Sequence, residues 1–328
     1  MHEFIHKAET YKPGVTVITP EWLWSEKLDG RYALWDGGVT RGMLVTDVPW
    51  ANTEKDTKAF IATGLWSSLG KPVFAPDWFL DQMPPFLVDG ELWMGRGRFQ
   101  ECMSITKRHV PDARWHDVRF MVFGAPLARN FLYPRVVSKT SVVIGPYVRE
   151  RWKLEDIGYA TFDKAYKLLR GYFDASTPTT VELVEYTRVG MSSAHAIMTS
   201  VCDAGGEGLM LRAPWDVWMP SRGGSMLKWK PWRDAEGVVI GYIAGDKRLA
   251  GMLGALIIKW EGKVFNLSGM DDCDRVVVGG HDMIPGEECS VTCPAFPLSS
   301  KITFRYRELT DSGIPKEARY WRKYEEGD

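Results

Sequence analysis

The sequence has few cysteines, and no two of them form a Cys-x-x-Cys pair, so it offers neither a zinc ribbon nor a dithiol redox motif. The five thiols are scattered and odd in number, which favours buried, reduced cysteines and a reducing compartment. The six histidines show no metal-ligand spacing either. A cysteine- or histidine-based metal centre is therefore not expected.

Long apolar runs are also missing. No segment approaches the length that a membrane span needs, and the first twenty residues lack the apolar core of a signal peptide. Internal repeats and low-complexity tracts are absent. We therefore expect a globular, cytoplasmic protein that makes no use of a membrane.

The chain also lacks a strong net charge. The formal charge is −1 and the pI is near 6.6, so any binding of nucleic acid must come from local segregation of charge. Residues 212–233 contain five basic residues and a single acid, Asp216. At 328 residues, with 45% hydrophobic composition, the chain can build two domains that each bury a core.

Lys27 lies at the centre of the most informative stretch, residues 24–37. The apolar residues Trp22, Leu23, Trp24 and Leu28 flank it, and an apolar surrounding favours the neutral, nucleophilic amine over the ammonium ion. Gly30 would let a bulky ligand approach the backbone, and residues 32–35 alternate as a strand does. A hairpin turn at 36–38 and a return strand from residue 39, carrying Arg41, are expected next. On these residues alone, a surface turn with a solvated lysine competes with the nucleophile.

Four further segments place charged or aromatic residues on predicted strands. Residues 86–93 form an apolar strand that contains Asp89 and Glu91, which would meet a ribose or a metal ion unless they are solvated at an edge. The strand 119–123 ends in Phe123, a core residue or a stacking platform. Glu207 lies at the mouth of the strand 207–212. Lys228 and Lys230 are two apart, so in an extended chain both amines face one side, toward an anion or toward solvent.

The remaining pattern predicts helices and a second domain. Helical periodicity or capping signals mark residues 78–82, 155–173 and 192–203, and residues 180–189 predict a strand. After a change of composition at 231–233, short strands with glycine turns follow at 235–242, 254–260, 263–267 and 302–307. This pattern is typical of a small barrel of the oligonucleotide-binding (OB) class.

Taken in order, Lys27-x-Asp29-Gly30, Asp89-Gly90-Glu91-Leu92, Phe123, Glu207-Gly208-Leu209-Met210 and Lys228-x-Lys230 resemble the nucleotidyltransferase motifs of ATP-dependent DNA ligases. The likeness is greatest to the minimal ligases of bacteria and bacteriophages. It implies an α+β nucleotidyltransferase (adenylation) domain with antiparallel sheets at residues 1–231. An all-β OB-fold domain would follow at residues 232–328.

The resemblance also implies a reaction and its participants. Lys27 would take AMP from ATP, the AMP would pass to the 5′-phosphate of nicked double-stranded DNA, and the neighbouring 3′-hydroxyl would then release it. ATP and Mg²⁺ would be the cofactors, and the protein would act as a monomer. The implied catalytic residues are Lys27, Lys228 and Lys230. Nucleotide contacts would also come from Glu26, Glu91 and Phe123, metal contacts from Glu207, Glu91 and Asp29, and DNA contacts from Arg41, Arg222, Arg31, Arg305 and Arg307.

The sequence departs from the family pattern at three places. Arg31 follows Gly30 directly, whereas the family places the arginine one residue later, where Tyr32 stands, and such a slip in a strand turns the side chain to the other face. Gly124 replaces the usual Asp after Phe123. Only residues 319–323 stand in for a C-terminal basic motif. An RNA ligase, a GTP-using capping enzyme and a catalytically dead nucleic-acid-binding relative remain as alternatives.

Residues 271–301 look like an insertion between strands of the second domain. They contain a possible strand at 275–278 and six acids against two basic residues, Arg275 and Lys301. Such a charge is unsuited to a phosphate clamp. We therefore expect a structural elaboration that faces away from DNA and can be shortened without loss of DNA binding.

Overall fold

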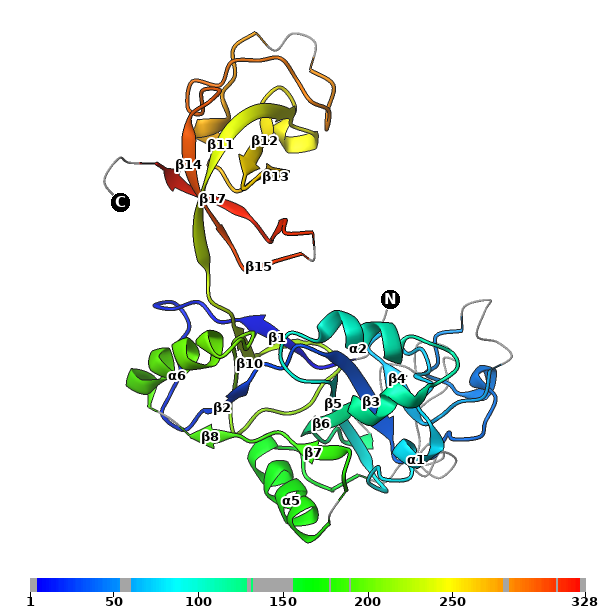
Figure 1. Cartoon of the computed structure of the whole chain (residues 1–328). Helices are drawn as coiled ribbons and strands as arrows, with labels where there is room; N and C mark the ends of the chain where they lie inside the picture. Colours follow the sequence, from blue (N-terminus) through cyan, green and yellow to red (C-terminus); the bar gives the residue numbers. More distant parts are fainter. Residues whose placement is uncertain are drawn as a thin grey trace. The chain divides into compact units, whose positions relative to one another are not determined.

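The computed structural model describes residues 5–53, 60–128, 131, 156–176, 178–188, 190–279, 283–310 and 312–324. The chain forms two compact units, Met1–Trp229 and Lys230–Asp328, so the division falls two residues before the expected one (Figure 1). No helix in the described part of the chain has both the length and the apolar character needed to cross a membrane.

The first unit contains two five-stranded, mostly antiparallel sheets. The strands of the first sheet are, in order, β1 (Lys7–Thr10), β10 (Arg222–Trp229), β9 (Leu209–Arg212), β2 (Leu23–Glu26) and β8 (Thr187–Arg188). Those of the second are β4 (Leu65–Ser67), β3 (Arg31–Asp36), β5 (Leu87–Trp93), β6 (Arg119–Gly124) and β7 (Val181–Leu183). Only β1–β10 and β6–β7 pair in parallel. The α+β class with antiparallel sheets is thereby confirmed.

Helices accompany these sheets, three of them at places where the sequence shows periodicity or capping signals. They are α1 (Asp77–Leu80), α2 (Phe99–Thr106), α5 (Phe162–Ala175) and α6 (Met191–Asp203), with short 3-10 turns η1 (Val45–Asp47) and η3 (Ala113–Asp117). The helix expected at 155–173 begins at Phe162, and residue 155 lies outside the described part. The strand expected at 180–189 divides into β7 and β8, and α2 was not predicted.

The return strand expected from residue 39 is wrong, because residues 37–42 form consecutive turns. Gly37, Gly38 and Gly42 all have φ near +80° (79°, 83° and 86°), a conformation that leaves the strand region. The buried Asp36 carboxylate stabilises the turn by accepting hydrogen bonds from the Gly38 N–H and the Thr40 hydroxyl. Strand β3 therefore pairs with the distant strands β4 and β5.

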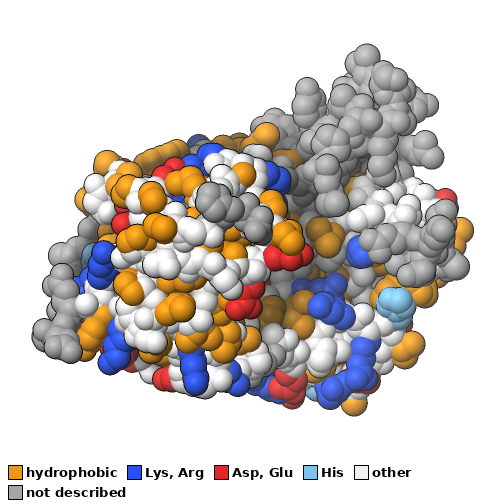
Figure 2. Space-filling model, turned by 90° about the horizontal axis from the view of Figure 1, so that it is seen from above, with side chains coloured by type: hydrophobic (Ala, Val, Ile, Leu, Met, Phe, Trp, Pro, Cys, Tyr) orange, Lys and Arg blue, Asp and Glu red, His pale blue; other side chains and the backbone are white. Residues whose placement is uncertain are grey.

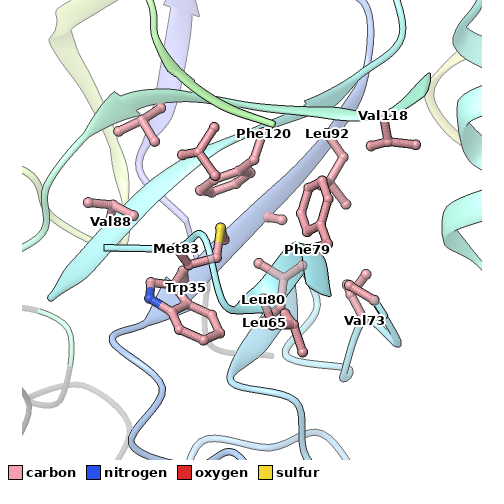
Figure 3. Close-up of a cluster of buried hydrophobic side chains, with 14 of the residues drawn as sticks. Trp35, Leu65, Val73, Phe79, Leu80, Met83, Val88, Leu92, Val118 and Phe120 are labelled. Atoms are coloured by element: carbon pink, nitrogen blue, oxygen red, sulfur yellow. The ribbon is translucent and has the colours of Figure 1, made fainter. Parts of the chain in front are cut away.

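The largest core of the first unit lies where β3, β5 and β6 meet α1 and α2. Trp35, Phe79, Leu92 and Phe120 converge there, each with at most 3% of its surface exposed (Figure 3). Burial of such large side chains contributes roughly 1.5–3 kcal/mol each. The second sheet is thus held rigidly on the side away from the cavity described below.

The second unit is a five-stranded antiparallel sheet. Its strands are, in order, β13 (Lys263–Leu267), β12 (Leu253–Trp260), β11 (Arg233–Ala244), β14 (Lys301–Tyr306) and β17 (Arg319–Lys323). The two outer strands approach each other at a single bridge, Ser268 to Arg319, so the expected barrel is not fully closed. A small hairpin of β15 (Glu308–Leu309) and β16 (Pro315–Lys316), and the 3-10 turns η4 (Lys247–Leu249) and η5 (Asp272–Arg275), complete its described elements.

Residues 271–301 are part of the core of this second unit. The strand predicted at 275–278 is wrong: η5 ends at Arg275, and only Val278 forms an isolated bridge. The buried Arg275 guanidinium donates to the carbonyls of Leu253, Gly254 and Met270 at 2.8–3.0 Å. Phe296 is fully buried against the sheet. Removing the segment would therefore expose the core, because it supplies core side chains as well as surface acids.

We predict that Phe296→Ala destabilises the second unit by about 3–5 kcal/mol, because it removes a fully buried ring and leaves a cavity. The control Leu298→Ala, at a side chain that is 56% exposed, should stay within about 0.5 kcal/mol of the parent. Urea denaturation followed by tryptophan fluorescence measures both. Equal effects would mean that this segment does not pack as described.

Candidate active site

A cavity of about 330 Å³ opens in the first unit and is lined by residues of both sheets. This volume is in the range of small-ligand sites. Six of the residues singled out from the sequence line it: Glu26, Lys27, Glu91, Phe123, Arg222 and Lys228. Segments separated by up to two hundred residues therefore meet at one place, as the order of the motifs suggested.

Lys27 and Glu207 are brought together by strand pairing. Strand β2 runs antiparallel to β9, with Glu26 opposite Leu209, so the residues just beyond these two positions are neighbours. The Lys27 N–H donates to the Gly208 carbonyl at 2.8 Å, and the Lys27 amine contacts a Glu207 carboxylate oxygen. The two side chains are 22% and 12% exposed. A lysine amine is thus held at the wall of a partly enclosed pocket.

Glu91 faces the same pocket from β5. Burial raises the pKa of its carboxyl to about 8; the charge of Lys27 lowers it and that of Glu207 raises it. At neutral pH the carboxyl is therefore mostly protonated and can donate as well as accept a hydrogen bond. Gly30 lies against it, since a Cβ at this position would be 2.7 Å from Glu91 Cγ. The glycine of the Asp29-Gly30 pair is thus required by this close approach.

Phe123 forms part of an apolar wall with Val184 and Met210. Its ring lies 6.0 Å from the Tyr32 ring, and its carbonyl accepts a hydrogen bond from the Arg212 guanidinium at 3.0 Å. Arg212 is buried and also pairs with Asp216 at 2.7 Å. An arginine from the first sheet thereby fixes the backbone of the second sheet beneath the cavity.

Glu26 is held by an arginine that the sequence reasoning missed. Arg96 donates to both carboxylate oxygens of Glu26 at 2.8 Å and to the Ala204 carbonyl at 3.0 Å. It thereby ties the loop after β5 to the end of β2 and to the C-terminus of α6. The sequence feature that could have indicated this role is a charged residue between two glycines, Gly95 and Gly97, in the loop after β5.

Two of the arginines expected to contact DNA have protein partners away from the cavity. Arg31 donates to the Thr106 carbonyl at the end of α2, and burial lowers the pKa of its guanidinium. Arg41 bridges Asp77, the first residue of α1, and Asp81, directly after it, at 2.6 Å each. Tyr32, in the slot that an arginine occupies in the family, contacts Asp89 at 3.3 Å instead.

Three expected site residues belong to the second unit. The Lys230 amine lies 3.7 Å from Glu308. The Arg307 side chain is only 8% exposed and covers the Trp232 ring at 3.6 Å. Arg305 pairs with Asp234 at 3.0 Å and stacks on the Trp321 ring at 3.2 Å, with 29% of its side chain exposed. Of the two arginines on and beside β14, Arg305 is the more accessible to a phosphate.

Among the described residues, no group of three or more Asp, Glu, His or Cys side chains is placed so that it could hold a metal ion. Asp29, Glu91 and Glu207, which the family resemblance implies as metal contacts, are not gathered in such a group, although Asp29 is near enough to Glu91 to raise its pKa. Their contact with a metal ion stays a prediction. Mg²⁺ needs only one or two protein carboxylates when a nucleotide supplies phosphate oxygens. Glu91 and Glu207 suit that limited role.

We predict that Glu91→Gln flattens the pH dependence of stability. Because the folded-state pKa of Glu91 is raised, its contribution is complete below its ordinary value of 4.5 and is lost as the pH rises through about 8. The amide does not titrate, so the free energy of unfolding of the variant should fall less between about pH 5 and about pH 9. Denaturation at several pH values measures this.

The control is Glu21→Gln, at an exposed site, which should follow the parent. Identical curves of unfolding free energy against pH for all three proteins would contradict the prediction.

Comparison with known proteins gives a consistent result for both units. A family model described as DNA ligase OB-like domain matches residues 244–323. A DNA ligase of Haemophilus influenzae is 25% identical over 303 residues, which is 92% of this chain and 86% of that protein. A structure of a Lig E DNA ligase, described as binding DNA with a minimal scaffold, has a TM-score of 0.65 and 25% identity over 99% of this chain and 100% of that chain. A structure named Pmar-Lig_Pre. shares the fold, with a TM-score of 0.64 and 15% identity over 98% of this chain and 67% of that chain.

Proposed function

Starting from the premise that this chain is a DNA ligase of the minimal ATP-dependent type, we propose that it seals nicks between a 5′-phosphate and a 3′-hydroxyl in duplex DNA. The reaction would pass through a lysyl-AMP and a DNA-adenylate. The observation that carries the proposal is the Lys27 amine, held beside Glu207 in a cavity that Glu91, Phe123 and Lys228 also line.

In the first step, Lys27 Nζ attacks the α-phosphate of ATP. The N–P bond forms, the bond between the α-phosphorus and the bridging oxygen breaks, and pyrophosphate leaves with the electron pair. Attack requires a neutral amine, and we assign the Glu207 oxygen that contacts Nζ as the acceptor of its proton. Lys228 lines the same cavity and offsets the negative charge of the phosphates. Magnesium, when bound with the nucleotide, would neutralise further phosphate charge near Glu207 and Glu91.

The adenosine would occupy the apolar part of the cavity. Phe123 and Met210 lie on its wall and offer faces on which a purine can stack. The protonated Glu91 carboxyl can exchange hydrogen bonds with the ribose hydroxyls. Arg212 supports this recognition indirectly, because it holds the Phe123 carbonyl.

The later steps require DNA. We assign Arg222, at the cavity, to the 5′-phosphate, and Arg41 and Arg305 to the phosphate backbone on their own units. Basic, acidic and apolar side chains are interspersed among the described residues on the face shown in Figure 2. The DNA contacts should therefore be local and directed mainly at phosphates.

We predict that Lys27→Ala abolishes formation of the covalent AMP adduct and nick sealing, while the fold survives, because the lost amine is the nucleophile. Labelled ATP followed by denaturing electrophoresis measures the adduct. Lys164→Ala, at an exposed site on α5, is the matched control and should retain both activities. Full labelling of the Lys27 variant would refute the assignment, and labelling of the parent by GTP instead of ATP would indicate a capping-type enzyme.

Binding to nicked duplex should be strongly salt-dependent and without sequence preference. Contacts to phosphates release counterions, so affinity should fall by more than about tenfold between roughly 50 mM and 200 mM salt. Fluorescence anisotropy with two nicked duplexes of unrelated sequence measures both properties. Affinity that stays constant with salt would contradict backbone recognition.

A further inference from the structure

We propose that Lys7 on β1 is a phosphate-binding residue at the cavity, a role that none of the sequence motifs assigns. The proposal rests on the proposed function, because it concerns a phosphate group of the same reaction. It is carried by the geometry of β1 and by the charge of the cavity wall.

Strand alternation places Lys7 on the cavity face of the first sheet. Along β10 the cavity is lined by Arg222, Met226 and Lys228, which are an even number of residues apart and therefore share one face. Lys7 pairs with Arg222 in the parallel register of β1 and β10. Paired residues of neighbouring strands project to the same side of a sheet. Lys7 is thus beside Arg222 on this face, and the Arg222 guanidinium donates to the Ala8 carbonyl at 2.7 Å.

His6, just before β1, belongs to a separate polar cluster. It lies 3.6 Å from the buried Asp216, to which the Ser225 hydroxyl also donates, and a Cβ on Gly223 would be 3.9 Å from His6 Nε2. His6 and Ala8 also line the cavity, so Lys7 is one of several neighbouring residues at this wall and the one among them that carries a lysine charge.

The cavity wall carries more positive than negative charge at neutral pH. Its cations are Lys7, Lys27, Arg222 and Lys228, and its acids are Glu26 and Glu91. Glu26 is already paired with Arg96, and Lys27 with Glu207, which leaves Lys7, Arg222 and Lys228 beside Glu91. Glu9, two residues after Lys7, reaches the same face near Gly224 and offsets part of the charge. The remaining cations suit a ligand with several phosphate charges.

Two phosphate groups of the reaction could meet Lys7. One is the β,γ-diphosphate of the nucleotide, which leaves as pyrophosphate when the bond from Lys27 Nζ to the α-phosphorus forms. The other is the 5′-phosphate of the nick. The two sources act at different steps, and a pre-adenylated nick bypasses the first step, so kinetics can separate them.

The experiment compares Lys7→Met, Lys7→Arg and the control Lys164→Met, an equal loss of charge at an exposed site on α5. The first arm measures the single-turnover rate of AMP-adduct formation from labelled ATP, and the reversal of the adduct by inorganic pyrophosphate. The second arm measures sealing of a chemically pre-adenylated nick by AMP-free enzyme. Circular dichroism checks that each variant is folded.

We expect the rate of Lys7→Met to fall roughly tenfold or more in one arm, which is the effect of losing one charge-assisted contact. The rates of Lys7→Arg and Lys164→Met should stay near that of the parent. Loss in the first arm alone identifies the leaving diphosphate, and loss in the second alone identifies the nick phosphate. Unchanged rates in both arms overturn the proposal. Equal losses in both arms that Lys7→Arg does not restore also overturn it, since they indicate a structural role. If the parent itself forms no adduct, the proposed function fails instead.

Discussion

The pairing of β2 with β9 is the constraint on which the site depends. Those two strands place Lys27, which opens one motif, against Glu207, which opens another, and the hydrogen bond from the Lys27 N–H to the Gly208 carbonyl fixes their separation. A lysine that acts as a nucleophile, as proposed for Lys27, loses much of the conformational freedom of its four-carbon side chain when it reacts. Holding its backbone in a sheet and its amine against a carboxylate supplies part of that order in advance.

The two sheets must also be held to each other, and buried polar contacts serve this purpose. Arg212 extends from β9 to the backbone of Phe123 on β6, and Arg96 extends from the end of β5 to Glu26. Arg212 is enclosed and fully paired with Asp216, which makes it costly to disrupt. Arg96 is half-exposed, so its two parallel hydrogen bonds matter more for geometry than for stability.

The sequence predicted the strands that carry the motifs, because each is an apolar run with a charged or aromatic residue inside it or next to its end. Lys27, Glu91, Phe123, Glu207 and Lys228 could be singled out from these positions. Arg96, Arg212 and Lys7 could not, because their roles come from pairing with residues distant in the chain.

The turn after Asp36 was mistaken for a strand because its cause, a buried carboxylate that accepts local hydrogen bonds, is a tertiary feature. The core role of residues 271–301 was hidden for a similar reason, since composition records their acids but not the burial of Phe296.

The parallel pairing of β1 with β10 has a consequence for biosynthesis. It places Lys7 beside Arg222, so one wall of the cavity is built from the first and the last strand of the unit side by side. Emerging from the ribosome, the N-terminal strand has no partner until more than two hundred further residues have been made. Closing so long a loop is slow relative to forming the local hairpins. A chain that stops short of Trp229 therefore lacks the complete cavity, and the ability to bind a nucleotide arises only at the end of the synthesis of this unit.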